Sequence, residues 1–192
     1  MEPGDITQML QRINEGDAQA AERILPLVYD ELRKLAASRM AREAPGQTLQ
    51  PTALVHEAWL RLGGDRQTDW KGRAHFFSAA AEAMRRILIE NARRRQTARG
   101  GAGLEKLSAS LTGFDVAAPQ LSDAELLLLN EAMENLVAHD ARKAEIVKQW
   151  YFVGLSREEV AEVLDLSVRT VTREWTYARA WLFAEMDRLR NA

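Results

Sequence analysis

Residues 155–182, LSREEVAEVLDLSVRTVTREWTYARAWL, decide the fold of the C-terminal part of the chain. Ser156 and Glu159 have the spacing of a capping box, which predicts a helix that begins at this point. A tight break is expected at Asp165, and Ser167 can cap a second helix. Two capped helices that are separated by a tight break are the pattern of a helix-turn-helix.

The second of these helices is predicted to have an apolar face and a polar face. Apolar side chains recur at helical spacing and are expected to pack inward, namely Val171, Trp175, Ala178 and Leu182. The outward face carries short polar side chains and two arginines, namely Arg169, Thr170, Thr172 and Arg173. Such side chains can read base edges in the major groove of DNA. The alternative interpretation is an αα-hairpin that has no role in DNA binding.

The composition limits the classes of protein that the chain can belong to. Its 192 residues are 46% apolar, which is enough for one or two domains with real cores. The chain contains no cysteine, which excludes disulfides and thiolate metal sites and fits a reducing cytoplasm. The sequence shows neither a signal peptide nor an apolar run of about 18 residues, so we expect a cytoplasmic protein without a membrane span.

The net charge bears on the predicted DNA binding. Proteins that bind DNA by themselves usually carry a basic surplus, because their cations release counterions from the duplex. This chain has a formal net charge of −2. We therefore expect a weak affinity for free DNA and a second component that brings the protein to its DNA site.

Apolar residues at helical spacing predict four helices in the N-terminal half, at about residues 5–16, 17–44, 51–62 and 73–95. Pro26 lies inside the second helix, so a kink or a break is expected there. Trp70 falls in a polar loop before the fourth helix. Phe76 and Phe77 fall on the inward face of that fourth helix.

The fourth helix ends in a basic region. Its arginines stand against a single acidic residue, Glu90, and are Arg85, Arg86, Arg93, Arg94, Arg95 and Arg99. Such a run is often a solvated face, or it complements the dipole at the C-terminal end of a helix. The aromatic residues nearby favour another interpretation, because arginines beside aromatic rings are the components of a surface that binds single-stranded nucleic acid.

Residues 97–121 are rich in glycine, alanine, serine and threonine and show no sustained helical period. This composition predicts a flexible linker. The sequence therefore predicts an all-α protein with two helical domains, at residues 5–96 and 122–190, on either side of the linker.

The second domain is expected to begin with another capping box, which Ser122 and Glu125 form. His139 and Asp140 are expected to turn the chain after the first helix of this domain. A further helix is predicted to end at Gly154, since glycine is the common C-terminal cap.

A metalloenzyme is one alternative to a DNA-binding protein. His56 and Glu57 begin like a zincin motif, but position 60 is Leu60, so the second histidine of that motif is missing. His75 and Glu82 are seven residues apart and can share a helix face, but the chain has only 3 histidines. The sequence also lacks a glycine-rich phosphate loop and a cysteine nucleophile. We therefore expect no catalytic residue, no metal, no cofactor and no enzyme activity.

Three segments resemble the sigma-70 family of RNA polymerase sigma factors, specifically the extracytoplasmic-function (ECF) group. TALVHEAWLRL at 52–62 resembles region 2.2 of that family, and HFFSAAAEAMRRILIENARRR at 75–95 resembles regions 2.3 and 2.4. AEIVKQWYFVGLSREEVAEVLDLSVRTVTREWTYARAWL at 144–182 resembles region 4 and is the most specific match. The resemblance implies a protein that binds core RNA polymerase and directs promoter recognition, DNA melting and transcription initiation.

The resemblance also implies roles for particular residues. A docking surface for the β′ clamp helices of core polymerase is implied at His56, Glu57 and Arg61. Binding and melting of the −10 element is implied for Phe76, Phe77, Glu82, Arg85, Arg86 and Arg93. Major-groove contacts to the −35 element are implied for Ser167, Arg169, Thr170, Thr172 and Arg173. The resemblance also implies two further possible partners, which are the β flap of the polymerase and an anti-sigma factor.

A stand-alone helix-turn-helix regulator is the main rival hypothesis. It accounts equally well for residues 144–189. It does not account for the arginine cluster in the other domain, whereas a protein that melts DNA needs a second surface. Binding to a palindromic site without polymerase would favour this rival.

Overall fold

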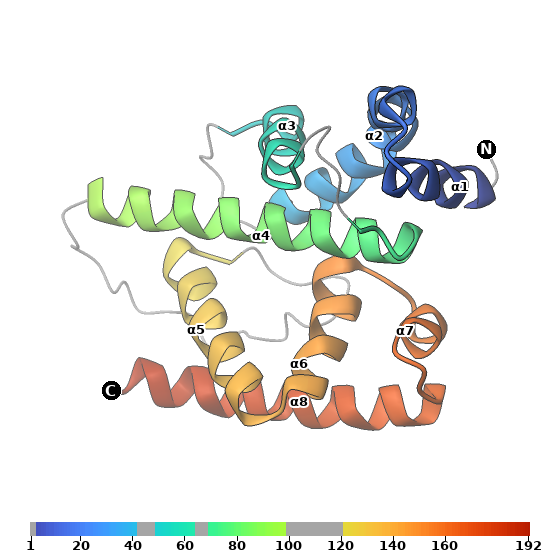
Figure 1. Ribbon diagram of the computed structural model, residues 1–192. Coiled ribbons are helices and arrows are strands. Elements are labelled where there is room, and N and C mark those ends of the chain that lie inside the picture. Colours follow the sequence, from blue (N-terminus) through green and yellow to red (C-terminus); the bar gives the residue numbers. More distant parts are fainter. Residues whose placement is uncertain (1–2, 42–48, 64–68, 99–120) are drawn as a thin grey trace. The chain divides into compact units, whose positions relative to one another are not determined.

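The computed structural model describes residues 3–41, 49–63, 69–98 and 121–192. These residues form the α-helices α1 to α8 and one short π-helix, η1, and they include no β-strand (Figure 1). The prediction of an all-α protein is therefore confirmed for the described part of the chain. The helices divide into two compact units, the first of which ends at Ile87 while the second begins at Leu88, inside α4.

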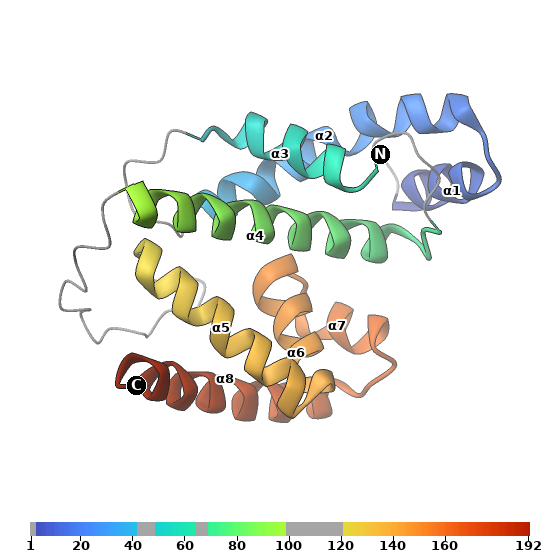
Figure 2. The ribbon, with the colours of Figure 1, turned by 60° about the vertical axis from the view of Figure 1, so that its left-hand side comes forward.

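The first unit contains the N-terminal helices. They are α1 (Pro3–Asn14), α2 (Ala18–Met40), α3 (Pro51–Arg61) and the first part of α4 (Arg73–Ala98). Helix α2 packs against both α1 and α3, as Figure 2 shows. The apolar residues at helical spacing are buried, and Leu10, Ile24, Leu54, Phe76 and Met84 are among the largest side chains of this core. The helical spacing therefore predicted the inward faces.

Helix α2 runs unbroken through Pro26, so the break that was one of two expected outcomes does not occur. A proline removes the hydrogen bond to the carbonyl four residues earlier, which belongs to Glu22. Glu22 is exposed, so water can satisfy that carbonyl. The helix ends at Met40. The predicted end near residue 44 falls on residues outside the described part of the chain.

Trp70 lies in a loop but is buried. The side-chain amide of Asn14 donates to the carbonyl oxygen of Trp70 at 2.8 Å and accepts from its backbone N–H at 2.9 Å. The indole packs edge-on against Phe76, with 5.2 Å between the ring centroids. Trp70 is therefore a core residue that fixes the approach of the chain to α4, although the residues before it had predicted only a polar loop.

Besides the last part of α4, the second unit holds the remaining helices. They are α5 (Asp123–His139), α6 (Ala141–Val147), η1 (Lys148–Val153), α7 (Arg157–Val163) and α8 (Val168–Arg190). Helix α8 packs against α5, α6 and α7, and Figure 1 shows it running along one side of them. The core between them contains Leu136, Ile146, Val160, Val171 and Leu182.

The predicted helix ends of the second unit are confirmed. Capping boxes are present at Ser122 and at Ser156, and Asp140 both ends α5 and caps α6. Gly154 has a φ of 84°, the left-handed conformation that a C-terminal cap requires. Asp165, at the tight break before α8, has a φ of 52°. Aspartate tolerates this conformation better than most residues, which explains its place in the turn.

One element of the second unit was not predicted. The helix that begins at Ala141 continues as the π-helix η1 before it reaches Gly154. Trp150 of η1 stacks on Trp175 of α8, with 4.6 Å between the ring centroids and an interplanar angle of 24°. The π-helix accommodates a contact between two distant segments, which is why local periodicity did not predict it.

Helix α4 continues to Ala98, so the prediction that the linker begins at Thr97 was wrong by two residues; residues 99–120 of the predicted linker lie outside the described residues. Among the helices that are described, none combines the length and the apolar character that crossing a bilayer requires.

Candidate nucleic-acid interface

The N-terminal end of α8 is fixed by its own side chains. The Ser167 hydroxyl oxygen accepts from the backbone N–H of Thr170 at 3.1 Å, which makes Ser167 the N-cap. The hydroxyl groups of the two residues also lie 2.8 Å apart and share a hydrogen bond. Their hydroxyl groups therefore hold the first turn of α8 in place.

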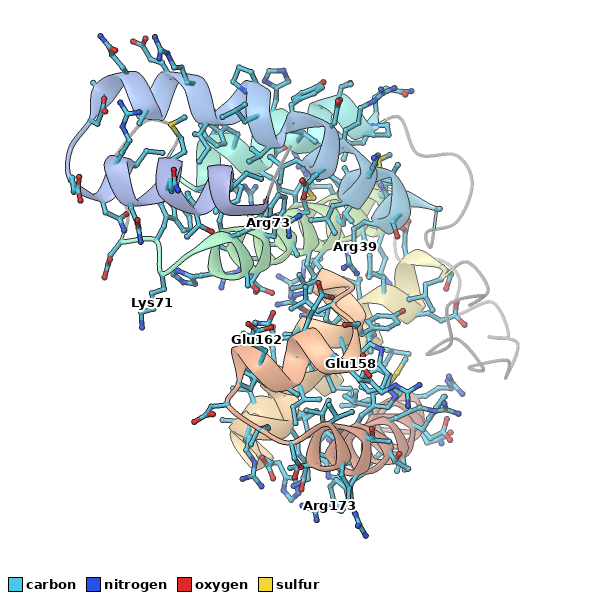
Figure 3. The ribbon with its side chains drawn as sticks, turned by 90° about the vertical axis from the view of Figure 1, so that its right-hand side faces the viewer. Arg39, Lys71, Arg73, Glu158, Glu162 and Arg173 are labelled. Atoms are coloured by element: carbon cyan, nitrogen blue, oxygen red, sulfur yellow. The ribbon has the colours of Figure 1, made fainter. Side chains whose placement is uncertain are left out.

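The outward face of α8 is polar and continuous. Its side chains follow helical spacing and are Arg169, Thr172, Arg173, Thr176 and Tyr177. The Arg173 side chain is 71% exposed, and Figure 3 shows it pointing away from the rest of the second unit. Because guanidinium groups can grip guanine or phosphate, this face matches what base reading in a major groove requires.

Sequence reasoning missed the second turn of this face. Thr176 and Tyr177 follow Arg173 at the spacing of one helical turn, and both are exposed. The hydroxyl of Thr176 donates to the carbonyl of Thr172, and the hydroxyl of Thr172 donates to the carbonyl of Val168, each at 2.9 Å. Continuing the helical spacing beyond Arg173 would have identified both residues.

The inward face of α8 confirms the predicted helical period. Val171, Trp175, Ala178 and Leu182 are all buried. Glu174 is buried between them and is only 6% exposed. Its pKa lies below the usual range, because hydrogen bonds from Arg173 and Lys143 outweigh the effect of burial. The carboxylate is therefore charged inside the interface between α6 and α8.

The basic region of α4 is partly neutralised by neighbouring carboxylates. Glu82 pairs with Arg85 at 2.8 Å and with Arg86 at 3.0 Å. Burial raises the pKa of Glu82, but the hydrogen bonds and charges of both arginines outweigh this effect and lower it. Arg95 pairs with Asp123 at 2.6 Å within the second unit. The predicted basic region is therefore smaller in effective charge than its sequence indicates.

Three arginines of α4 are exposed and can contact an anion. The Arg86 side chain is 67% exposed even though it contacts Glu82. Arg93 is exposed, and within the described residues it forms no ion pair. Arg94 is also exposed and donates to the Asn91 amide oxygen at 2.6 Å. Arg99 lies outside the described residues.

The aromatic rings expected beside these arginines are inside the first unit. Phe76 is 1% exposed, and Phe77 is buried as well. Their ring centroids lie 5.3 Å apart in an edge-to-face contact, and the Arg73 guanidinium lies 5.2 Å from the centre of the Phe77 ring. The structure therefore does not bring an exposed ring of either residue to the arginines. Stacking with a base would require such a ring to leave the core.

The outward residues of α3 form a separate small surface. His56 is exposed, and Arg61 pairs with Glu57 at 3.0 Å. Leu60 lies among them and is 74% exposed, the highest value of any large apolar side chain in the described part of the chain. Sequence reasoning had considered Leu60 only as a mismatch to a zinc motif. A single exposed leucine is common on protein surfaces, so Leu60 by itself does not identify a binding partner.

Two of the residues that were considered for a metal site, His75 and Glu82, are occupied by other contacts. Nδ1 of His75 accepts from the backbone N–H of Lys71 at 3.2 Å, and Glu82 is held by its arginines. Within the part of the chain that the structure describes, no group of three or more His, Cys, Asp or Glu is arranged to hold a metal ion.

Two capped helices on either side of a tight turn, α7 and α8, place the second unit in the helix-turn-helix class. The family described as ECF sigma factor matches residues 3–188, which is nearly the whole chain. The chain therefore belongs to the ECF sigma factor family, whose members are non-enzymatic initiation factors that act with core RNA polymerase on promoter DNA. No curated protein and no solved structure matches the sequence.

Proposed function

We propose that this sigma factor recognises the −35 element of a promoter through α8 and contacts the −10 element through α4. The observation that carries the proposal is the exposed polar face of α8, with Arg173 71% exposed on a helix whose other face is buried. A rigid helix with such a face is suited to the major groove of double-stranded DNA. Ser167, Arg169, Thr170 and Thr172 complete the proposed reading surface.

For the −10 element, the proposal gives the leading role to Arg86 and Arg93, which are exposed on α4. Flipping a base out of the stack requires a few kcal/mol, which stacking and pocket contacts of about 1–3 kcal/mol per base can offset. Phe76 and Phe77 are buried, so their participation requires a change in the first unit. Contact with polymerase or with the opened promoter is the proposed cause of that change.

For polymerase binding, we propose that the exposed face of α3 docks on the β′ clamp helices. Leu60 supplies apolar area there, while His56, Glu57 and Arg61 supply polar contacts around it. We propose that residues 5–96 act as region 2 and that residues 122–190 act as region 4. Region 4 would also contact the β flap of the polymerase. Residues 97–121 join the two regions. Because core polymerase works in the bacterial cytoplasm, the same location is proposed for this protein.

In vitro transcription tests the proposed function directly. A library of genomic fragments is transcribed by purified bacterial core polymerase with and without the protein, and the start sites are mapped. Initiation that is specific to particular fragments and requires the protein is the expected result. The aligned start sites would also supply both promoter elements.

The opposite result would favour the stand-alone regulator. In that case core polymerase gains no initiation and does not co-elute with the protein, while the protein alone still retains particular fragments. The net charge of −2 favours the sigma factor, because a protein that relies on polymerase for delivery has no need of strong free affinity for DNA.

A further inference from the structure

Glu174 is a charged residue at a core position of α8. It is 6% exposed and lies on the same helix face as Val171 and Ala178, which are both fully buried. A carboxylate at such a position is stable only when cations or hydrogen-bond donors surround it. The partners of Glu174 therefore show what this carboxylate holds in place.

Three cations from two helices surround the Glu174 carboxylate. Oε2 lies 3.0 Å from Nζ of Lys143 on α6. Oε1 lies 2.8 Å from Nη2 of Arg173 and 3.8 Å from Nη2 of Arg142. Lys143 is itself held by Asp140, the N-cap of α6. One buried carboxylate thus joins the reading helix to α6 and also contacts an exposed arginine of the proposed reading face.

The contact with Arg173 has two physical consequences. A guanidinium has five N–H donors, so Arg173 keeps donors for DNA while one of its nitrogens is held by Glu174. A side chain that is already oriented loses less conformational freedom when it binds. The carboxylate also offsets part of the positive charge at this place, which weakens the attraction to phosphates that is independent of sequence.

We propose that Glu174 is a positioning residue for promoter recognition, which acts on DNA through Arg173 rather than by touching DNA. This inference rests on the proposed role of α8. It predicts that Glu174 raises the preference for the correct promoter over other DNA. A purely structural role, in which Glu174 only joins α6 to α8 through Lys143, predicts instead a loss of stability without a selective effect.

A double-mutant cycle between Glu174 and Arg173 tests the inference. The substitutions are Glu174→Gln, Arg173→Ala and both together, in the full chain with core polymerase. The probe is a promoter fragment from the mapped start sites, compared with the same fragment after its upstream element is scrambled. Selectivity is the ratio of initiation from the two templates. Glu174→Gln is expected to lower this ratio about fivefold or more in the otherwise unchanged chain, and to have no further effect when Arg173 is alanine.

Lys143→Gln is the matched control. It removes the Lys143 ion pair with Glu174 and the contact of Lys143 with the Tyr177 ring, but it leaves Arg142 of α6 and Arg173 beside the Glu174 carboxylate. Lower thermal stability with unchanged selectivity is expected. The inference is overturned if Lys143→Gln lowers selectivity as much as Glu174→Gln does, if Glu174→Gln leaves selectivity unchanged, or if its effect is the same with and without Arg173.

Misfolding of the variant and failure of the proposed function can each be distinguished from failure of this inference. Glu174→Gln leaves Lys143 paired with Asp140, so the lysine is not left alone. Should the variant unfold, Lys143→Gln combined with Glu174→Gln removes the buried charges together, and the same cycle is run in that background. Initiation by the unchanged protein reports the proposed function, whereas the selectivity of the variants reports the role of Glu174.

Discussion

The two candidate DNA-binding surfaces differ in what they expose. On α8 the arginines lie on the outer face of a helix whose other face is packed, so the proposed reading surface is already exposed in the protein alone. On α4 two of the arginines are bound to Glu82, and the aromatic rings nearby lie in the core. Reading a duplex and capturing an opened strand therefore place different demands on the same chain.

The difference has a physical basis. A DNA duplex presents its base edges without any change, so a rigid, preformed helix is the best reader. A single strand exists only after melting, and a permanently exposed aromatic surface would be an apolar patch in water until that moment. In the structure Phe76 is buried and Arg85 is paired with Glu82, so the proposed melting surface on α4 presents neither an exposed Phe76 ring nor the full charge of its arginines. The comparison predicts that the two surfaces respond differently to mutation.

The largest expected effect is a difference in stability between substitutions on the packed face of α8 and on the exposed face of α3. Leu182 is fully buried in the second unit, so Leu182→Ala is expected to lower the free energy of unfolding by about 2–5 kcal/mol. Leu60→Ala removes the same atoms from a side chain that is 74% exposed, and it is expected to change stability by less than about 0.5 kcal/mol. Urea unfolding followed by circular dichroism measures both values. Equal losses for the two variants would contradict the assigned burial.

The same Leu60→Ala variant sharpens the proposed docking role of α3. The variant should retain its fold while co-eluting less with core polymerase, because apolar contact area is lost from the centre of the proposed surface. Unchanged co-elution would remove Leu60 from that surface.

The next effect concerns the reading face itself. Arg173→Ala is expected to remove about 1–3 kcal/mol of discrimination between a mapped promoter and the same promoter with an altered upstream element. Arg188→Ala, at the exposed C-terminal end of the same helix, is the control; it removes the hydrogen bonds to Glu185 and lowers stability, but it should leave discrimination unchanged. Initiation from both templates is measured at one salt concentration. A loss that is equal on all sequences would reassign Arg173 to a phosphate contact.

How much the sequence could predict depends on the separation of the residues that interact. The capping boxes at Ser122 and Ser156 involve partners three residues apart, so they were readable and are confirmed. The burial of Trp70 depends on Asn14, which lies 56 residues away, and no local pattern marks that pair. Glu174 was not predicted to be buried for the same reason, since its partner Lys143 belongs to another helix.

The aromatic residues of α4 illustrate the limit for the candidate site. Helical spacing placed Phe76 and Phe77 on the inward face, and the structure confirms their burial. The family resemblance placed the same two residues at the −10 element. Burial of these rings and contact with the −10 element are compatible only if the first unit has a second conformation. A sequence pattern does not show how the first unit would change to that conformation.

A smaller effect is expected at the melting surface. Arg86→Ala should reduce initiation from double-stranded promoters and spare a template that is already unpaired around the start site. Loss of one phosphate contact should also lower the slope of log affinity against log salt by about 0.7–0.9. Arg12→Ala changes an arginine that is paired with Asp17 elsewhere in the first unit, and it serves as the control. Equal loss on both templates would argue against a role in melting.

The smallest expected effect is on the pH dependence of stability. It follows from the charge of Glu185, which links α8 to α5. Its carboxylate accepts from Arg188 at 2.7 Å and from the Asn135 amide of α5 at 2.7 Å. The Arg188 hydrogen bond, aided by Asn135 and opposed by burial, lowers the pKa of Glu185 from 4.5 to about 2. A lowered pKa means that the folded state binds this proton less well than the unfolded state. The charged carboxylate therefore stabilises the fold above about pH 4.5, and this contribution is lost as the pH falls toward 2.

Glu185→Gln tests this account of the support for the reading helix. The variant should be less stable than the unchanged protein at pH 7, and the gap should shrink as the pH is lowered through the range in which the glutamate becomes protonated. Urea unfolding at several pH values gives the gap directly. Asp187→Asn, which changes an exposed carboxylate paired with Arg190 on the same helix, is the matched control. A gap that stays constant or widens in acid would show that Glu185 supports α8 by packing or neutral hydrogen bonding rather than by its charge.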